Sequence, residues 1–261
     1  MEKISAIIIT QNEERNIGRC LNSLIGIADE VVVVDSGSTD GTERICREHG
    51  ALFHHHPWEG YSAQKNHAET LSTGDWTLSI DADEALSDEL RQSLLLLKGR
   101  DADPDMVFCF NRLTNYCGTW IRHCGWYPDE KIRLWRRGTC RWSGIVHEEP
   151  VFCHPVRRQR LDGDLLHYSY YSVEEHASRQ ITYAQLAAKK SHDGGKRFRC
   201  GDLLLRPAWT FLRNYLFKGG FLDGRTGFTV CRMAAFYTLI KYARLRELGG
   251  TGKEAEVKGD K

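Results

Sequence analysis

Two aspartates separated by one residue, Asp81 and Asp83, follow a short apolar segment, Trp76 to Ile80. The segment has the composition of a buried strand, so the two carboxylates should stand where that strand reaches solvent. In extended geometry both side chains point the same way, and a divalent cation would relieve their repulsion. Oxygen ligands favour Mg²⁺ or Mn²⁺, which usually take one or two protein carboxylates and leave positions for water and phosphate oxygens. The pair therefore predicts a site for a metal ion and a diphosphate.

Asp pairs also cap helices and turns, so the weight of this pair depends on the elements that position it. Four short apolar segments predict strands, at residues 4–10, 30–34, 51–55 and 76–80. Helical stripes separate them, at residues 17–24, 40–50 and 61–73. This alternation argues for right-handed βαβ units and a largely parallel sheet.

Polar residues follow three of these strands: Asn12 with Glu13, then Asp35, then the pair Asp81 and Asp83. Ligands of parallel sheets bind beyond the carboxyl ends of the strands, so these side chains should share one rim. Asp35 stands where an acid can accept hydrogen bonds from a nucleotide's base or ribose. No Gly-x-Gly-x-x-Gly follows the first strand, which disfavours a dinucleotide cofactor. The rim is predicted to bind a nucleotide.

Residues 115–155 are rich in aromatic, Gly, Cys and charged residues and have no long helical stripe, which indicates acceptor-binding or lid structure. Within them, residues 131–135 alternate charged and apolar side chains, as in a half-exposed strand. Residues 142–149 place His147 and Glu148 beside apolar positions, consistent with side chains that project into a pocket. The competing interpretation of Glu148 is an ordinary salt-bridge or solubility residue.

The C-terminal third is expected to be helical, beginning with a capping box at Ser172 and Glu175. Residues 203–221 combine aromatic and basic side chains, a composition that can lie in a membrane interface. The alternative is a helix that packs on the main domain. Residues 249–261 have little apolar content and are expected to form a disordered tail.

The charge, the cysteine content and the apolar stretches of the chain limit the kinds of partner and compartment that fit it. The formal net charge is 36 − 35 = +1, so no overall field favours nucleic acid, and no nucleic-acid partner is expected. The nine cysteines include no Cys-x-x-Cys pair and favour neither a zinc ribbon nor a disulfide framework, which fits a reducing cytosol. Basic residues interrupt every apolar stretch that approaches the length of a membrane span. We expect a cytoplasmic protein.

Four motifs in the first hundred residues share one order and spacing with a known family. They are Thr10–Glu13, Val33–Thr42, Gln64–Asn66 and Asp81–Asp83. Together they resemble family 2 glycosyltransferases of the GT-A type. Two later segments, residues 142–148 and 219–228, resemble the branch that contains lipopolysaccharide core β-1,4-glucosyltransferases.

The resemblance implies an α/β fold of the GT-A type, with a mostly parallel central sheet flanked by helices and a helical, amphipathic C-terminal extension. Residues 1–165 would form the catalytic domain, with a donor half at 1–100 and an acceptor half at 101–165. Residues 166–248 would form the extension, and 249–261 the tail.

The resemblance also implies a role for each matching residue. A UDP-sugar donor would be bound by Thr10, Asn12, Glu13, Asp35, Ser36, Lys65, Asn66 and Asp81. Asp81 and Asp83 would hold the divalent cation, Mg²⁺ or Mn²⁺. Such enzymes invert the anomeric centre by direct displacement, so a carboxylate must take the acceptor hydroxyl's proton. Glu148 is the candidate base, with Asp129 as the alternative.

The implied acceptor is a lipopolysaccharide core or related glycolipid, and the implied sugar is a hexose, with glucose expected. Residues 203–228 would then attach the protein to the cytoplasmic face of the inner membrane. Three alternatives remain: an acceptor such as polyprenyl phosphate or another cell-surface polysaccharide precursor, a phosphatase with an aspartate nucleophile, and a nucleotide-sugar binding protein without transferase activity.

Overall fold

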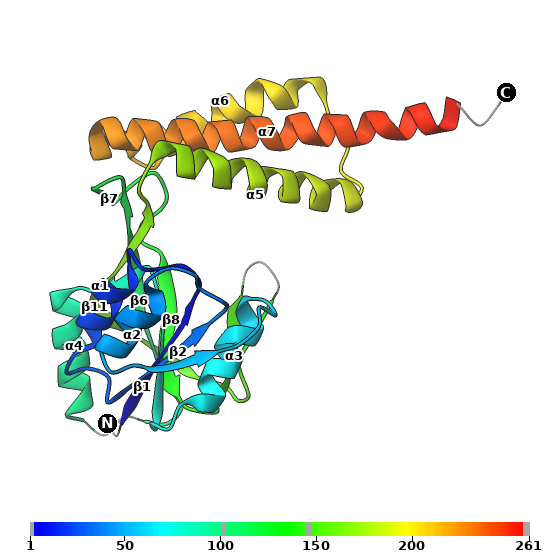
Figure 1. Cartoon of the computed structure of the whole chain (residues 1–261). Helices are drawn as coiled ribbons and strands as arrows, with labels where there is room; N and C mark the ends of the chain where they lie inside the picture. Colours follow the sequence, from blue (N-terminus) through cyan, green and yellow to red (C-terminus); the bar gives the residue numbers. More distant parts are fainter. Residues whose placement is uncertain (1–2, 101–102, 145–147, 258–261) are drawn as a thin grey trace. The chain divides into compact units, whose positions relative to one another are not determined.

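The computed structural model describes residues 3–100, 103–144 and 148–257 (Figure 1). The chain forms two compact units. Unit 1 comprises Met1–Leu113 and Pro128–Tyr168, and unit 2 comprises Thr114–Tyr127 and Ser169–Lys261. The sequence predicted a boundary at residue 165 and placed residues 114–127 in the first domain. The structure assigns this short segment to unit 2.

Unit 1 is built on a mixed sheet with the strand order β3-β2-β1-β4-β8-β6-β11-β5. Four strands form its parallel half: β1 (Ile4–Thr10), β2 (Glu30–Asp35), β3 (Leu52–His55) and β4 (Trp76–Asp81). The other half contains β5 (Glu84–Leu86), β6 (Met106–Tyr116), β8 (Glu130–Arg136) and β11 (Arg157–Tyr170). Strand β8 runs antiparallel to both β4 and β6, so the change of direction occurs directly beside β4.

Helices cover both faces of the parallel half. They are α1 (Ile17–Leu24), α2 (Thr42–Glu48), α3 (Tyr61–Leu71) and α4 (Asp88–Lys98). Alternate residues of β1 point to opposite faces, and both faces are apolar. Ile4 and Ile8 join a core cluster with residues of α1, α2 and α4, whereas Ile7 packs in a separate cluster with Ala68 of α3. Burial on both faces explains the continuous apolar run in the sequence.

Unit 1 also contains a separate two-stranded antiparallel sheet, β9 (Cys140–Ser143) with β10 (Glu149–Phe152). Its Trp142 packs edge-to-face on Trp135 of β8, with ring centroids 5.7 Å apart. Asn66 of α3 holds the same strand, because its side-chain amide exchanges two hydrogen bonds with the Trp142 backbone. Strand β9 is thereby held against β8 and α3.

Unit 2 is mainly helical. Its elements are β7 (Thr119–Ile121), α5 (Val173–Asp193), η1 (Cys200–Leu203), α6 (Leu205–Leu212), the π-helical turn η2 (Arg213–Phe217), η3 (Gly220–Asp223) and α7 (Gly224–Val257). In Figure 1, α7 lies between α5 and α6. The predicted cap of α5 is confirmed, because Ser172 Oγ accepts a hydrogen bond of 3.0 Å from the Glu175 amide. Segment 114–127 belongs here because Tyr116, Ile121 and Cys124 pack against Val230 and Cys231 of α7.

The glycine-rich motif at residues 219–228 has a structural role within unit 2. A Cβ on Gly227 would collide with the carbonyl oxygen of Gly220, so both η3 and the start of α7 depend on the missing side chain. Next to it, the Asp223 carboxylate accepts a 2.8 Å hydrogen bond from the His123 amide and lies 2.7 Å from the His123 ring Nδ1. The motif therefore joins α7 to the segment 114–127.

The predicted α/β class with a helical C-terminal extension is confirmed. One expectation about the extension is corrected: residues 249–257, predicted as part of a disordered tail, continue α7, while 258–261 lie outside the described residues. Lys253, Glu254, Ala255 and Glu256 are good helix formers, which outweighs their low apolar content. Within the described residues, no helix combines the length and apolar character needed to cross a membrane.

Candidate active site

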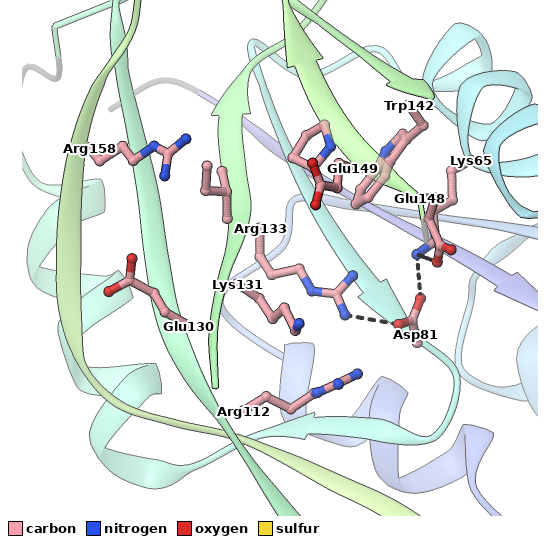
Figure 2. A pocket seen from close by; sticks show the side chains of 12 residues that line it. Lys65, Asp81, Arg112, Glu130, Lys131, Arg133, Trp142, Glu148, Glu149 and Arg158 are labelled. Atoms are coloured by element: carbon pink, nitrogen blue, oxygen red, sulfur yellow. Dashed lines mark hydrogen bonds and ion pairs between the residues drawn. The ribbon is translucent and has the colours of Figure 1, made fainter. Parts of the chain in front are cut away.

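A cavity of about 520 Å³ opens in unit 1 at the carboxyl end of β4 (Figure 2). Most of its lining side chains are charged, and they come from both halves of the sheet and from the β9–β10 sheet. They are Lys65, Asp81, Arg112, Glu130, Lys131, Ile132, Arg133, Trp142, Glu148, Glu149, Pro150 and Arg158. The cavity thus brings together three of the residues singled out in the sequence, Lys65, Asp81 and Glu148.

Lys65 of α3 connects the other two (Figure 2). Its Nζ lies 2.9 Å from Asp81 Oδ1 and 3.2 Å from Glu148 Oε1. The Lys65 side chain is only 3% exposed, and a buried ammonium needs such carboxylate partners. It also lies 4.4 Å from the ring centroid of Trp142, a favourable cation–π position. The candidate base is thereby placed beside the aspartate at the end of β4, although 67 residues (148 − 81) separate them in sequence.

Asp81 has a second cationic partner that the sequence analysis missed. Arg133 of β8 donates from Nη2 to Asp81 Oδ2 at 2.8 Å and to both carboxylate oxygens of Glu84, at 2.8 and 2.9 Å. Glu84 also accepts a 2.9 Å hydrogen bond from the Asp81 amide. The alternating pattern at residues 131–135 correctly puts charges on one face of β8, but only Lys131 is partly exposed there, at 37%, whereas Arg133 is 4% exposed. Nothing in the local pattern distinguishes a buried arginine from a solvated one.

The buried charges shift each other's protonation. Burial alone would raise the pKa of Asp81, but the charges of Arg133 and Lys65 hold it well below its usual range. Burial raises the pKa of Glu84, and Arg133 only partly opposes this. Asp81 is therefore firmly ionised in the folded protein. Its charge is balanced by two side chains of this chain.

The second aspartate of the motif has a different environment. Strand β4 ends at Asp81, and Asp83 lies in the turn before β5, so the pair is not in the extended geometry expected from the sequence. Asp83 Oδ2 lies 3.2 Å from His167 Nε2 of β11, and the backbone of the turn is held by a 2.9 Å hydrogen bond from the Tyr168 amide to the Asp83 carbonyl oxygen. The two carboxylates therefore have separate partners.

A divalent cation fits this turn if phosphate oxygens and water complete its coordination. In the part of the chain that the structure describes, no group of three or more His, Cys, Asp or Glu side chains is arranged to hold a metal ion. Mg²⁺ and Mn²⁺ do not need such a cage, since they often use one or two protein ligands together with substrate phosphates. Asp83 and His167 offer a carboxylate oxygen and an imidazole nitrogen at one point. Both oxygens of Asp81, in contrast, already contact cations.

The loops after β1 and β2 bind each other through the residues predicted to contact a nucleotide. The Asn12 amide donates to Ser38 Oγ at 2.8 Å, and Asn12 Oδ1 accepts from the Thr39 amide at 2.8 Å. Asp35 is fully buried, and its Oδ2 accepts hydrogen bonds from the Gly37 and Ser38 amides.

Three further predicted residues stand around these loops. Ser36 Oγ accepts a 2.8 Å hydrogen bond from Gln64, and Glu13 Oε2 accepts one of 2.8 Å from Asn16. Thr10 Oγ1 is buried and has no hydrogen-bond partner among the residues that the structure describes. The loops are thus preformed by their own hydrogen bonds.

Two further predicted residues, Asn66 and Asp129, lie outside the lining of the cavity. Asn66 is engaged with the Trp142 backbone, so its observed contact is to the wall of the site. Asp129, the alternative base, has ion pairs of 2.8 Å with Arg112 and 2.9 Å with Lys131. His147, predicted to project into a pocket, lies outside the described residues. Three more residues of the site were not predicted, Arg112, Arg158 and His167, because their significance depends on contacts between distant segments.

Comparisons with known proteins identify the family of this chain. A family model described as glycosyl transferase family 2 matches residues 5–163. An uncharacterized glycosyltransferase of Rickettsia typhi is 34% identical over 257 residues, which cover 95% of this chain and 88% of that protein. The lipopolysaccharide core biosynthesis glycosyltransferase LpsC of Rhizobium meliloti is 32% identical over 257 residues, which cover 93% of this chain and 91% of that protein.

A likeness to a solved structure is more distant. Glucosyl-3-phosphoglycerate synthase from Mycobacterium tuberculosis, in complex with Mn²⁺, UDP and glucosyl-3-phosphoglycerate, is 23% identical. The match covers 44% of each chain, with a TM-score of 0.35.

Proposed function

Because this chain belongs to glycosyl transferase family 2, we propose that it transfers a hexose, with glucose as the first candidate, from a UDP-sugar to a lipopolysaccharide core or related glycolipid. The observation that carries the proposal is the meeting of Lys65, Asp81 and Glu148 in one cavity at the end of β4. The similarity to LpsC along nearly the whole chain supports the acceptor class.

The donor would occupy the rim from the loops after β1 and β2 to the end of β4. The preformed loops around Asn12 and Asp35 would take the nucleoside, and the diphosphate would lie toward Asp81 and Asp83. A divalent cation held by Asp83 and His167 would neutralise charge that develops on the departing diphosphate. Lys65 would keep Asp81 and Glu148 in place as the donor binds.

Transfer would proceed by a single displacement. The acceptor oxygen forms a bond to the anomeric carbon while the bond from that carbon to UDP breaks, and the hydroxyl proton passes to Glu148. Glu148 lines the cavity and is 21% exposed, so an acceptor can reach it. Asp129 does not line the cavity and is paired with two cations, which makes Glu148 the better candidate.

The acceptor class calls for a way to reach a membrane, and unit 2 has a suitable surface. Between residues 204 and 228, nine large apolar side chains are at least 42% exposed: Leu204, Leu205, Trp209, Leu212, Leu216, Phe217, Phe221, Leu222 and Phe228. Arg206, Arg213 and Lys218 are interspersed among them. Exposed apolar groups with basic neighbours suit the interface of an anionic bilayer. We call this set the 204–228 surface and propose that it attaches the protein to the cytoplasmic leaflet.

The reaction is tested by screening UDP-sugars for metal-dependent release of UDP, with a lipid A core acceptor and, separately, with polyprenyl phosphate. One UDP-sugar should release UDP faster when the core acceptor is present. Glu148→Gln should keep donor binding and lose about 10² to 10⁴ in transfer rate, the usual contribution of a general base. Glu48→Gln, an exposed carboxylate on α2, serves as the control.

Two outcomes would change the assignment. If Glu148→Gln transfers sugar normally and Asp129→Asn does not, Asp129 is the base. If only polyprenyl phosphate accepts sugar, the acceptor class is wrong while the donor chemistry stands.

A further inference from the structure

We propose that the side of the cavity beyond β4 recognises an acidic sugar, meaning an acceptor residue that carries a carboxylate or a phosphate. The inference rests on the proposed function and names its substrate class. The wall in question, here called the basic wall, consists of Arg112 on β6, Lys131 and Arg133 on β8, and Arg158 on β11.

The strand order separates the basic wall from the nucleotide loops. Strands β1 and β2, which carry the loops of Asn12 and Asp35, lie on one side of β4, and β8, β6 and β11 lie on the other. In the view of Figure 2, Arg158 and Glu130 lie across the cavity from Lys65 and Glu148. A donor that extends from the loops to Asp81 therefore leaves the basic wall to the acceptor.

The charges of the basic wall exceed those of their partners nearby. Arg112 and Lys131 share Asp129, and Arg112 also lies 3.7 Å from Glu84 Oε1, a carboxylate that Arg133 already pairs with. Arg158 is exposed and makes no ion pair within the described part of the chain. A ligand oxyanion can bind here with charge-assisted hydrogen bonds, and guanidinium groups suit the planar carboxylate and the phosphate equally.

Two buried N–H donors belong to side chains that line the same cavity. The Nε of Arg133 and the indole Nε1 of Trp142 are each buried without a hydrogen-bond acceptor among the described residues. Both side chains line the cavity, and they are 4% and 5% exposed respectively. An unsatisfied buried N–H is costly, so both positions call for a ligand oxygen.

Two carboxylates line the same cavity as the basic wall, which favours a sugar over a simple anion as the ligand. Glu130 and Glu149 line the cavity and are exposed, so they can accept hydrogen bonds from ligand hydroxyls. Cations for one acidic substituent, carboxylates for hydroxyls and the Trp142 ring together match a polyhydroxylated ring with one negative group.

The test compares small sugars of known charge. In the presence of UDP and Mn²⁺, the protein is titrated with glucose 6-phosphate, glucuronate, glucose and inorganic phosphate, and the dissociation constants are measured by calorimetry. The two acidic sugars should bind about tenfold more tightly than glucose, as expected for one charge-assisted contact. Arg158→Gln and Lys131→Gln should each remove about tenfold of that preference while glucose and UDP bind unchanged.

Arg141→Gln is the matched control, since Arg141 is exposed on β9 and does not line this cavity. Glucose that binds as tightly as the acidic sugars would overturn the proposal. So would inorganic phosphate that binds as tightly as glucose 6-phosphate, or an equal loss in Arg141→Gln. If the unmodified protein does not bind UDP, the proposed function itself is wrong. Failure of the proposed function can therefore be distinguished from failure of the acidic-sugar proposal.

Discussion

The two units differ in which unfavourable groups they contain. Unit 1 buries charge: Lys65, Glu84 and Arg133 are almost inaccessible around the cavity. Unit 2 exposes apolar surface, with Trp209 and Phe217 among the exposed side chains of the 204–228 surface. Each arrangement is locally unfavourable, since buried charges lose hydration and exposed apolar groups order water.

The difference indicates which kind of ligand or partner each unit suits. Buried charges that neutralise one another can exchange partners with an ionic ligand, as the proposed donor site requires. Exposed apolar groups without such pairing fit a partner that is itself apolar. Three experiments test this contrast.

The largest effect is expected from removing the central cation of unit 1. Arg133→Met should lower the free energy of unfolding of unit 1 by about 3 to 5 kcal/mol, because Asp81 and Glu84 would remain buried with an uncompensated charge. Urea denaturation followed by tryptophan fluorescence measures the change. The exposed Arg141→Met should stay within about 0.5 kcal/mol of the original protein. Equal effects of both variants would mean that the buried network does not stabilise unit 1.

A smaller effect is expected at the 204–228 surface. The double variant Trp209→Ser with Arg213→Gln should bind vesicles that contain anionic lipid about thirtyfold more weakly, since an indole and one basic residue together contribute about 2 kcal/mol at an interface. Sedimentation with vesicles gives the partition coefficient, and UDP-sugar binding should persist.

The control for this surface changes the same chemical types on α5. Tyr183 and Lys190 are also exposed, so Tyr183→Ser with Lys190→Gln alters comparable groups outside the 204–228 surface. Similar vesicle binding by the two double variants would show that the 204–228 surface has no special part in membrane attachment.

The smallest effect is expected on the pH dependence of the stability of unit 2. Burial lowers the pKa of His176 from 6.5 to about 4. The unfolded chain therefore takes up a proton that the folded chain does not, and stability is full above pH 6.5 and falls as the pH drops toward 4. The slope should reach at most about 1.4 kcal/mol per pH unit.

Trp126 lies 5.9 Å from the His176 ring and offers a fluorescence signal for this measurement. His176→Phe should have a shallower slope, and an unchanged slope would mean that other groups set it.

Elements with strong local signals were predictable from the sequence. Strand β4 was expected at residues 76–80 and is found at Trp76–Asp81, because a short apolar run with a polar end has few other solutions. The family and the GT-A type of α/β fold followed from four motifs whose order is visible in the chain, and both are confirmed.

Contacts between distant segments were not predictable. The ion pair of Arg133 with Asp81 spans 52 residues, and that of His167 with Asp83 spans 84. No periodicity reports such a contact, because each partner looks like an ordinary charged residue in its own segment. For the same reason the extended geometry assumed for Asp81 and Asp83 was wrong: the turn after Asp81 is fixed by pairing with β11.

Because residues 114–127 belong to unit 2, the two units cannot be separated by cutting the chain at one place. Unit 2 needs two pieces of sequence that are separated by residues 128–168, which belong to unit 1. A truncation after Tyr168 would leave Tyr116 and Ile121 without the α7 side chains that bury them. Contacts of this sequence separation also carry the entropic cost of closing the intervening loop. Neither unit is therefore a contiguous fragment that could be exchanged by a single crossover between related genes.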